Sequence, residues 1–187
     1  MGTQFWTYED MQAKLPAESR YEIMNSELID MSPVPNPEHQ RILKKLFRAM
    51  DTFIKNKYLG EVNFAPYDVI LNQGNVAQPD IFFIAKANAG RVSSKGYEGV
   101  PDLTVEIISP SSHYRDTVEK KALYERFGVK EYWLIDPANR VIEVFALQNG
   151  EYALHAFVAE EGKASSAVLE GFEVDSSNIF TSPESQL

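Results

Sequence analysis

Hydrophobic residues group into a strand, a helix and a second strand in the middle of the chain. Residues 103–108 form a short run rich in branched apolar side chains, which Ser109-Pro110 closes. Helical spacing then begins at Ser111 or Ser112 and ends at Gly128, and residues 132–135 form a second apolar run. Two buried strands joined by a helix are most simply parallel neighbours linked by a right-handed crossover. We therefore expect both strands inside one sheet that is covered by helices.

The rest of the chain predicts further strands and helices around this unit. They are a helix at 7–14 capped by Thr7, a hairpin at 21–31, a long helix at 38–57, paired strands at 61–71 and 77–84, a hairpin at 141–158 and an edge strand at 168–174. Residues 86–99 are rich in glycine, serine and charged residues, which is typical of a polar loop. Residues 181–187 lack an apolar period and predict a disordered tail. The pattern indicates an α/β (α+β) fold, with a sheet flanked by helices and additional β-hairpins.

The length of 187 residues and the hydrophobic content of 44% suit a single domain with a sizeable core, residues 1–187. The absence of cysteine excludes disulfides, thiolate zinc sites and cysteine nucleophiles, and it fits a reducing compartment. No apolar run approaches the length of a membrane span, and no signal segment opens the chain. We therefore expect a soluble cytoplasmic protein with no membrane partner.

The net charge of −9 argues at first against a nucleic-acid partner, because affinity for a polyanion comes mainly from lysine and arginine. The charge is unevenly distributed. Residues 38–130 hold 14 basic and 11 acidic side chains, whereas the two flanks hold 4 basic and 16 acidic ones. The central segment is therefore mildly basic, and we expect at most weak DNA binding that depends strongly on salt.

Glu106 stands in the middle of the first predicted strand, where an unpaired carboxylate is costly to bury. The side chain therefore needs a cation nearby. Lys120 is a candidate because it shares a helix face with apolar residues such as Tyr124, whereas Lys121 lies on a more polar face. From these residues alone, a structural ion pair between Glu106 and Lys120 is the simplest interpretation.

Asp80 adds a second acid, because it opens an apolar strand that precedes Glu106 at the spacing of a hairpin with a long loop. Strands joined in this way can bring the two carboxylates side by side. Adjacent carboxylates repel unless a divalent metal binds between them. Two acids and one lysine are the groups that metal-assisted phosphodiester hydrolysis requires.

Several motifs resemble a known family. Pro79-Asp80, followed by an acid in an apolar strand and then a lysine, resembles the PD-(D/E)XK nuclease superfamily. The Glu-x-x-Ser-Pro-Ser turn at 106–111 and the strand Gly-Val-x-Glu-Tyr-Trp-Leu-x-Asp-Pro at 128–137 resemble the Uma-two family of restriction-endonuclease-like proteins. The similarity covers roughly residues 20–147. One position departs from the superfamily pattern, because Ile108 replaces the lysine of Glu-x-Lys, and Lys120 is taken to fill its role.

The resemblance implies a restriction-endonuclease-like mixed sheet and a nuclease that depends on magnesium or manganese. It implies that Asp80 and Glu106 hold the metal, that the carbonyl of Ile107 completes the coordination, and that Lys120 assists the attacking water. The candidate supporting residues are Glu22, His39, Asp68 and Gln78. Without the resemblance, the pattern around Glu22 is typical of a solvated strand residue, and that around His39 is typical of a packed histidine.

A second class of function remains open. The scaffold also suits a non-catalytic module for protein association or weak nucleic-acid binding, in which the site is only an ion pair. The acidic flanks and the displaced lysine favour this alternative. In either case, the edge of the apolar hairpin at 141–158 must be covered by a helix, a loop or a partner subunit. We expect a partner subunit, and therefore a homodimer.

Overall fold

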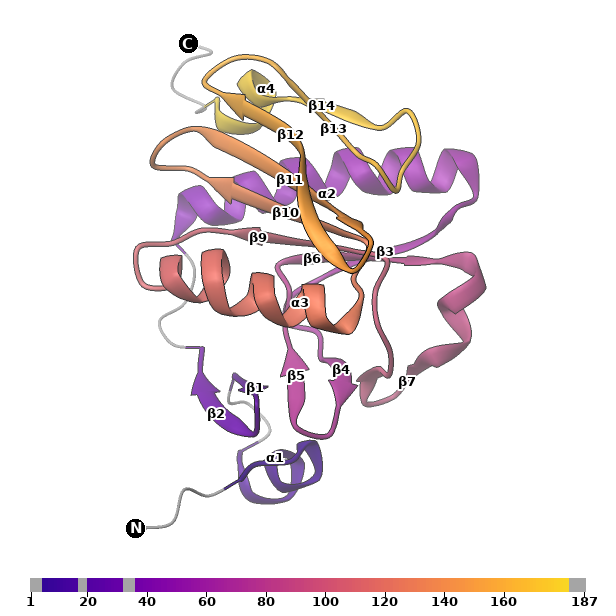
Figure 1. Ribbon diagram of the computed structural model, residues 1–187, viewed down its shortest axis with the longest axis vertical. Coiled ribbons are helices and arrows are strands. Elements are labelled where there is room, and N and C mark those ends of the chain that lie inside the picture. Colours follow the sequence, from indigo (N-terminus) through magenta and orange to yellow (C-terminus); the bar gives the residue numbers. More distant parts are fainter. Residues whose placement is uncertain (1–4, 17–19, 32–35, 182–187) are drawn as a thin grey trace.

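The computed structural model describes residues 5–16, 20–31 and 36–181, which form two six-stranded sheets, a small third sheet and covering helices (Figure 1). The central sheet has the order β12-β11-β10-β9-β6-β3, built from β3 (Gly60–Phe64), β6 (Ile81–Ala85), β9 (Leu103–Ile107), β10 (Glu131–Asp136), β11 (Val141–Gln148) and β12 (Glu151–Ala159). Strands β9 and β10 are parallel, and all other neighbours in this sheet are antiparallel. The central sheet is therefore mixed, with β12 and β3 at its edges.

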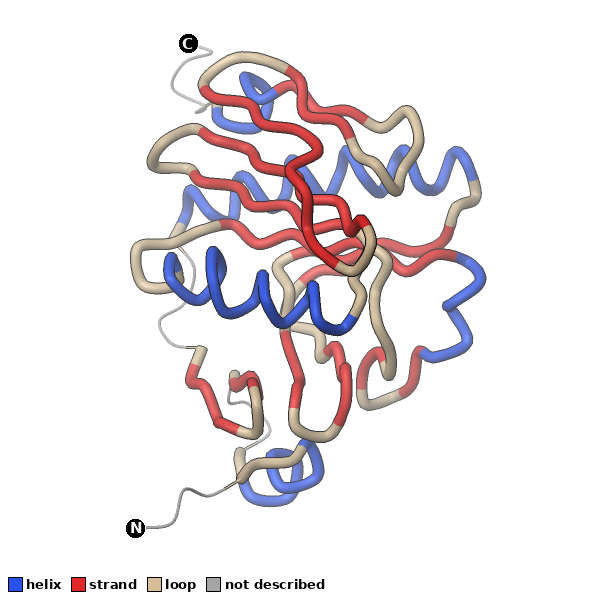
Figure 2. The backbone as a smooth tube through the Cα atoms, in the orientation of Figure 1, coloured by secondary structure: helices blue, strands red, loops and turns tan. Residues whose placement is uncertain are grey.

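The second sheet carries shorter strands below the central sheet in the view of Figure 2. Its order is β2-β1-β5-β4-β8-β7, built from β1 (Tyr21–Met24), β2 (Glu27–Asp30), β4 (Val69–Asn72), β5 (Asn75–Ala77), β7 (Val92–Ser93) and β8 (Gly96–Tyr97). The third sheet pairs β13 (Lys163–Ser165) with β14 (Glu173–Asp175).

Helices cover both faces of the central sheet (Figure 1). The helical elements are α1 (Tyr8–Lys14), α2 (Pro37–Lys57), the 3-10 helix η1 (Lys86–Arg91), the π-helical segment η2 (Arg115–Lys120), α3 (Lys121–Phe127) and α4 (Ser176–Phe180). Helix α2 lies on one face, and η2 continues directly into α3 on the other. None of the helices in the described ranges combines the length and the apolar content that a membrane span requires.

The alternation of side chains along β9 assigns Glu106 to the α3 side of the sheet. Val105 and Ile107 belong to the apolar cluster beneath α2. Successive side chains of a strand point to opposite faces, so Glu106 points the other way. On that face Tyr124 of α3 packs with Tyr132 and other apolar residues of the neighbouring strands. Glu106 is therefore buried between the sheet and the helix.

Most predicted elements are confirmed. The parallel pair of β9 and β10 with its helical crossover, the long helix α2, and the hairpins at β1–β2 and β11–β12 all form where the sequence predicts them. Helix α1 begins after Thr7, whose side chain forms a capping box with Asp10.

Four predictions about segment boundaries need correction. The predicted strand 61–71 is divided into β3 and β4, and its partner is divided into β5 and β6, because the prolines at Pro66 and Pro79 have no backbone N–H to give to a strand. Residues 86–99 fold into η1, β7 and β8 rather than a loop. The predicted strand 168–174 is wrong except at its end, where β14 begins. Of the predicted tail 181–187, residues 182–187 lie outside the described residues.

Candidate functional site

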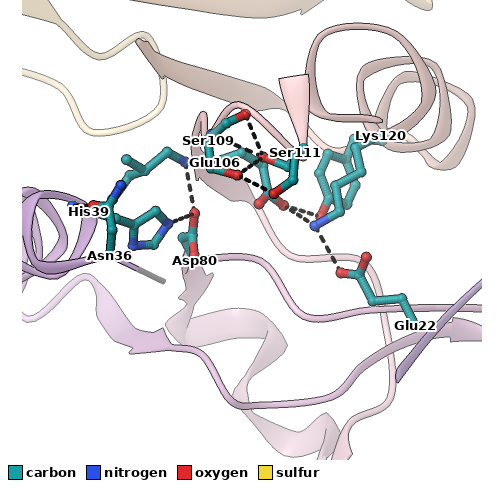
Figure 3. Close-up of polar contacts among 11 residues, drawn as sticks. Glu22, Asn36, His39, Asp80, Glu106, Ser109, Ser111 and Lys120 are labelled. Carbon is teal, nitrogen blue, oxygen red and sulfur yellow. Dashed lines mark hydrogen bonds and ion pairs between the residues drawn. The ribbon is translucent and has the colours of Figure 1, made fainter. Parts of the chain in front are cut away.

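A cavity of about 270 Å³ lies at the ends of β6 and β9, beside the start of the helix on the α3 side. The residues that line it are Arg20, Met31, Asn36, His39, Gln78, Asp80, Glu106, Ile107, Ser109, Pro110, Ser111, Ser112, Arg115, Asp116 and Lys120. Most of the candidate residues named from the sequence are in this lining. Figure 3 shows their polar contacts.

Asp80 and Glu106 both line this cavity; Asp80 directly precedes β6, and Glu106 lies in β9, the antiparallel neighbour of β6. In the register of β6 and β9, Ile81 pairs with Val105. Continuing the register by one residue places Asp80 across from Glu106. Residues directly opposite in an antiparallel pair have Cβ atoms about 4.5–5.5 Å apart. The hairpin spacing in the sequence therefore corresponds to two facing acids.

Lys120 connects two buried carboxylates (Figure 3). Its Nζ lies 3.0 Å from Oε1 of Glu106 and 2.8 Å from Oε1 of Glu22, and the lysine side chain is only 1% exposed. Tyr124 donates a further hydrogen bond of 2.8 Å to Oε1 of Glu106. Glu22 is itself fully buried, so its interpretation as a solvated strand residue is wrong. Glu22 is buried through its contact with Lys120 of the η2 segment, although the local pattern of β1 marks this residue as polar.

Burial and mutual repulsion shift the protonation of these groups. Burial raises the pKa of Glu106 well above its usual range; the attraction of Lys120 opposes this rise, and the nearby carboxylates add to it. Burial also raises the pKa of Asp116 to about 6. For Lys120, burial acts to lower the pKa, but the carboxylates of Glu106 and Glu22 outweigh it and raise the pKa. The lysine therefore stays charged, whereas Glu106 and Asp116 take up protons more readily than exposed carboxylates do.

His39 holds the second acid in place (Figure 3). Its Nε2 lies 3.0 Å from Oδ2 of Asp80, and the backbone N–H of Ile107 donates to the same oxygen at 2.8 Å. The Nδ1 atom of His39 is buried and makes no hydrogen bond with a described residue. His39 is thus a packed histidine that also contacts a candidate site residue, because Asn36 caps α2 and places the first turn beside Asp80.

Asp116 is a cavity residue that the sequence analysis did not single out. It is 3% exposed and lies in the π-helical segment η2, which also carries Lys120. A π-helical turn within a helix is uncommon and often marks a functional position. The sequence did contain a signal for this residue, because Asp116 precedes Lys120 by about one helical turn and so lies on the same face of the helix.

Gln78 and Asp68 link this cavity to its surroundings. The backbone N–H of Gln78 donates to Oε1 of Glu22 at 2.7 Å, and its Nε2 donates to Oδ1 of Asp68 at 2.9 Å. Gln78 lines the cavity, but Asp68 lines a neighbouring one. Asp68 lies between β3 and β4 rather than inside a strand, so the expected strand position is corrected.

The donor set suits a divalent metal held by few protein ligands. Asp80 and Glu106 use one oxygen each for the hydrogen bonds above, and Oε2 of Glu22 is a buried oxygen without a hydrogen bond among the described residues. Within residues 5–16, 20–31 and 36–181, no group of three or more His, Asp or Glu side chains is placed to hold a metal. Mg²⁺ commonly uses one or two carboxylates and takes its other ligands from water and substrate phosphates.

Comparisons with known proteins identify a family and a structural neighbour. The sequence model of the Uma2 family, described as "Putative restriction endonuclease", matches residues 5–177. A crystal structure titled as that of a putative nuclease belonging to DUF820, from Anabaena variabilis ATCC 29413, superposes with a TM-score of 0.74 at 16% sequence identity. The superposition covers 93% of this chain and 97% of that one. No curated protein matches the sequence significantly. The expected restriction-endonuclease-like fold, a mixed sheet flanked by helices, is thereby confirmed.

Proposed function

Because this chain belongs to the Uma2 family, we propose that it is a nuclease that hydrolyses phosphodiester bonds of DNA with the help of a divalent metal. The observation that carries the proposal is that Asp80 and Glu106 line one cavity together with Lys120. Asp80 and Glu106 would hold Mg²⁺ or Mn²⁺, with the carbonyl of Ile107 as a further ligand. The bound ion would polarise the phosphate and lower the pKa of a water molecule.

The protein's own groups would orient the reactants. His39 and the Ile107 N–H fix the carboxylate of Asp80 through one oxygen, which leaves the other free to face the cavity. Lys120 places a positive charge beside Glu106, where it would orient the attacking water or stabilise charge that develops on the phosphate. Arg20, Arg115 and the hydroxyls of the 109–112 turn also line the cavity and are suitable donors to phosphate oxygens.

The test measures metal binding and cleavage in the same variants. Calorimetric titration with Mn²⁺ should show binding to the parent protein. Asp80→Asn and Glu106→Gln should each weaken that binding by more than about tenfold, since even the loss of an outer partner of a metal ligand costs about 10–100-fold. The control is Asp51→Asn, which removes an acid of α2 that pairs only with Lys55. The parent should cleave a plasmid with Mg²⁺, and the two site variants should not.

Two outcomes would count against the proposal in different ways. Equal Mn²⁺ affinity in the parent and in both site variants would show that these acids hold no metal. Metal binding without cleavage of single-stranded, duplex or supercoiled DNA would support the metal site and contradict the nuclease activity.

The burial of Lys120 also supports the second candidate function. A lysine that is 1% exposed and paired with two carboxylates has the form of a structural ion pair. In a non-catalytic module for protein association or weak nucleic-acid binding, Mn²⁺ would not bind, and the substitutions would change only stability. The titration above therefore separates the two candidates.

A further inference from the structure

A larger cavity of about 650 Å³ lies next to the candidate site. Arg20 and Gln78 line both cavities, so the two cavities adjoin at these residues. The size is in the range of pockets that bind small organic groups, roughly 300–1,000 Å³. The cavity is therefore large enough to receive part of a substrate whose phosphate lies in the site.

The walls of this cavity combine apolar side chains with a few polar ones. Met11 and Leu15 contribute apolar surface from α1 and its end, and Tyr67 contributes an aromatic ring. Gln78 is only 8% exposed, and its Oε1 is buried without a hydrogen bond to any described residue. A buried acceptor without a partner is costly, so a small movement of the Gln78 side chain toward the N–H donor of a ligand in this cavity would be favourable.

Asp68 offers a second acceptor at the same wall. Its Oδ1 accepts one hydrogen bond from Nε2 of Gln78 at 2.9 Å. Its Oδ2 lies 3.1 Å from the hydroxyl of Tyr8, which also lies 2.7 Å from the carbonyl of Lys95. A tyrosine has one hydroxyl proton for these two acceptors, and each carboxylate oxygen can accept two hydrogen bonds. Asp68 therefore keeps acceptor capacity for a ligand.

A carboxylate beside an unpaired amide oxygen is a poor site for phosphate and a good site for an amino group, which has two N–H donors for the two acceptors. Carboxylates accept hydrogen bonds from the amino group of cytosine in nucleic-acid recognition. An aromatic ring and apolar side chains suit the faces of a base. The part of a nucleic acid that fits this cavity is thus the base rather than the backbone, while Arg20 at the shared wall suits the adjacent phosphate.

We propose, on the basis of the proposed nuclease function, that this cavity binds an unstacked nucleobase with an exocyclic amino group, next to the phosphate that is cleaved. A base that is paired and stacked in a duplex cannot enter a concave pocket, and it must first leave the stack. The substrate class is therefore a single-stranded segment, or a duplex position where a base is easily extruded.

The test uses nucleosides in the absence of metal, so that it is independent of catalysis. Ligand-observed NMR titrations compare deoxycytidine with deoxyuridine, which has a carbonyl oxygen in place of the amino group and a single N–H donor, on ring N3. Deoxycytidine should bind at least about fivefold more tightly, the low end of the discrimination that one good polar contact provides. Asp68→Asn should remove this preference.

A steric variant identifies the cavity as the place of binding. Ser94 is an exposed residue of the cavity wall, and Ser94→Trp should fill the space and reduce deoxycytidine binding by at least about tenfold. The matched control is Ala87→Trp, at an exposed position of η1 that lies outside the cavity lining. The proposal is overturned if neither nucleoside binds, if both bind equally, or if the two tryptophan variants behave alike.

The outcome for the base pocket can be separated from that for the nuclease. If the protein cleaves no DNA but binds deoxycytidine, and Ser94→Trp abolishes that binding, the base pocket is supported and the nuclease proposal is contradicted. If cleavage requires Asp80 and Glu106 but deoxycytidine is not preferred, the nuclease proposal is supported and the base pocket is contradicted.

Discussion

Lys120 Nζ lies 2.8 Å from Oε1 of Glu22, and both side chains are buried, at 1% and 0% exposure. This ion pair joins the helical crossover of the central sheet to strand β1 of the second sheet. Since Lys120 also contacts Glu106, one ammonium group balances two buried carboxylates. The two sheets therefore depend on a charge arrangement in the candidate site, and changes there should alter stability as well as activity.

Lys120→Met should lower the free energy of unfolding by about 3–5 kcal/mol at pH 7.5, because it leaves two buried carboxylates without their cation. The loss should be smaller at pH 5, since acids with raised folded-state pKa values take up protons there and become neutral. Urea denaturation at both pH values measures the effect.

Lys121→Met is the matched control for this substitution. The Lys121 ammonium lies over the ring of Phe145, 3.5 Å from its centroid, and its loss should cost only about 0.5–1 kcal/mol. Equal effects of the two substitutions would mean that the Lys120 ion pairs contribute little to stability.

Asp116→Asn should stabilise the protein at high pH and not at low pH. Burial raises the pKa of Asp116 from 3.8 to about 6 in the folded state, so the folded protein binds this proton more tightly than the unfolded chain. The charged carboxylate therefore costs stability above pH 6, and the cost disappears as the pH falls towards 4. A shift of this size corresponds to roughly 2–3 kcal/mol.

Urea denaturation of parent and Asp116→Asn in EDTA, at pH 4, 6 and 8, checks this prediction. The neutral asparagine keeps the size of the side chain and should remove the part of the pH dependence that the Asp116 carboxyl contributes. A variant that is less stable than the parent at pH 8 would show that the charged form is favoured in the folded protein.

The local part of the fold and the central site pair could be predicted from the sequence. Apolar periodicity indicated β9, the crossover helix and β10, because this signal depends only on residues that are close together in the sequence. The antiparallel neighbourhood of β6 and β9, which brings Asp80 and Glu106 to one cavity, followed from the spacing of two strands. The contact of Lys120 with Glu106 followed from the helix face that it shares with Tyr124.

What the sequence could not indicate depends on long-range packing. The contact between His39 and Asp80 joins α2 to the residue that precedes β6, and no local pattern marks it. The burial of Glu22 involves contacts with Gln78 and Lys120, which lie far along the chain. The division of one predicted hairpin between two sheets had a visible signal in Pro66 and Pro79, but the sequence did not show that a second sheet exists.

Glu131→Gln should lower the free energy of unfolding by about 2–4 kcal/mol. The fully buried carboxylate of Glu131 accepts hydrogen bonds from Trp133 Nε1 and the Ser166 hydroxyl at one oxygen, and from the backbone N–H groups of Ala167 and Val168 at the other. An amide keeps only one acceptor oxygen, so two of these buried donors lose their partner.

Thermal or urea denaturation measures this effect, with Glu143→Gln as the control. Glu143 is a half-exposed acid of the neighbouring strand β11, and its substitution should change stability by no more than about 0.5 kcal/mol. A stable Glu131→Gln variant would show that the C-terminal segment does not depend on this carboxylate.

The expected homodimer remains a prediction, and the edge of the central sheet is where we expect it to form. Strand β12 pairs within the sheet only with β11, and it exposes Leu154 and Phe157 at 54% and 56%. An edge strand with exposed apolar residues can pair with a second copy. The double variant Leu154→Lys/Phe157→Lys should be monomeric, because charged residues at an edge oppose pairing, whereas Tyr58→Lys should stay dimeric although Tyr58 is 83% exposed. Light scattering coupled to size-exclusion chromatography measures the mass of each protein, and a parent that is monomeric at micromolar concentration would contradict the prediction.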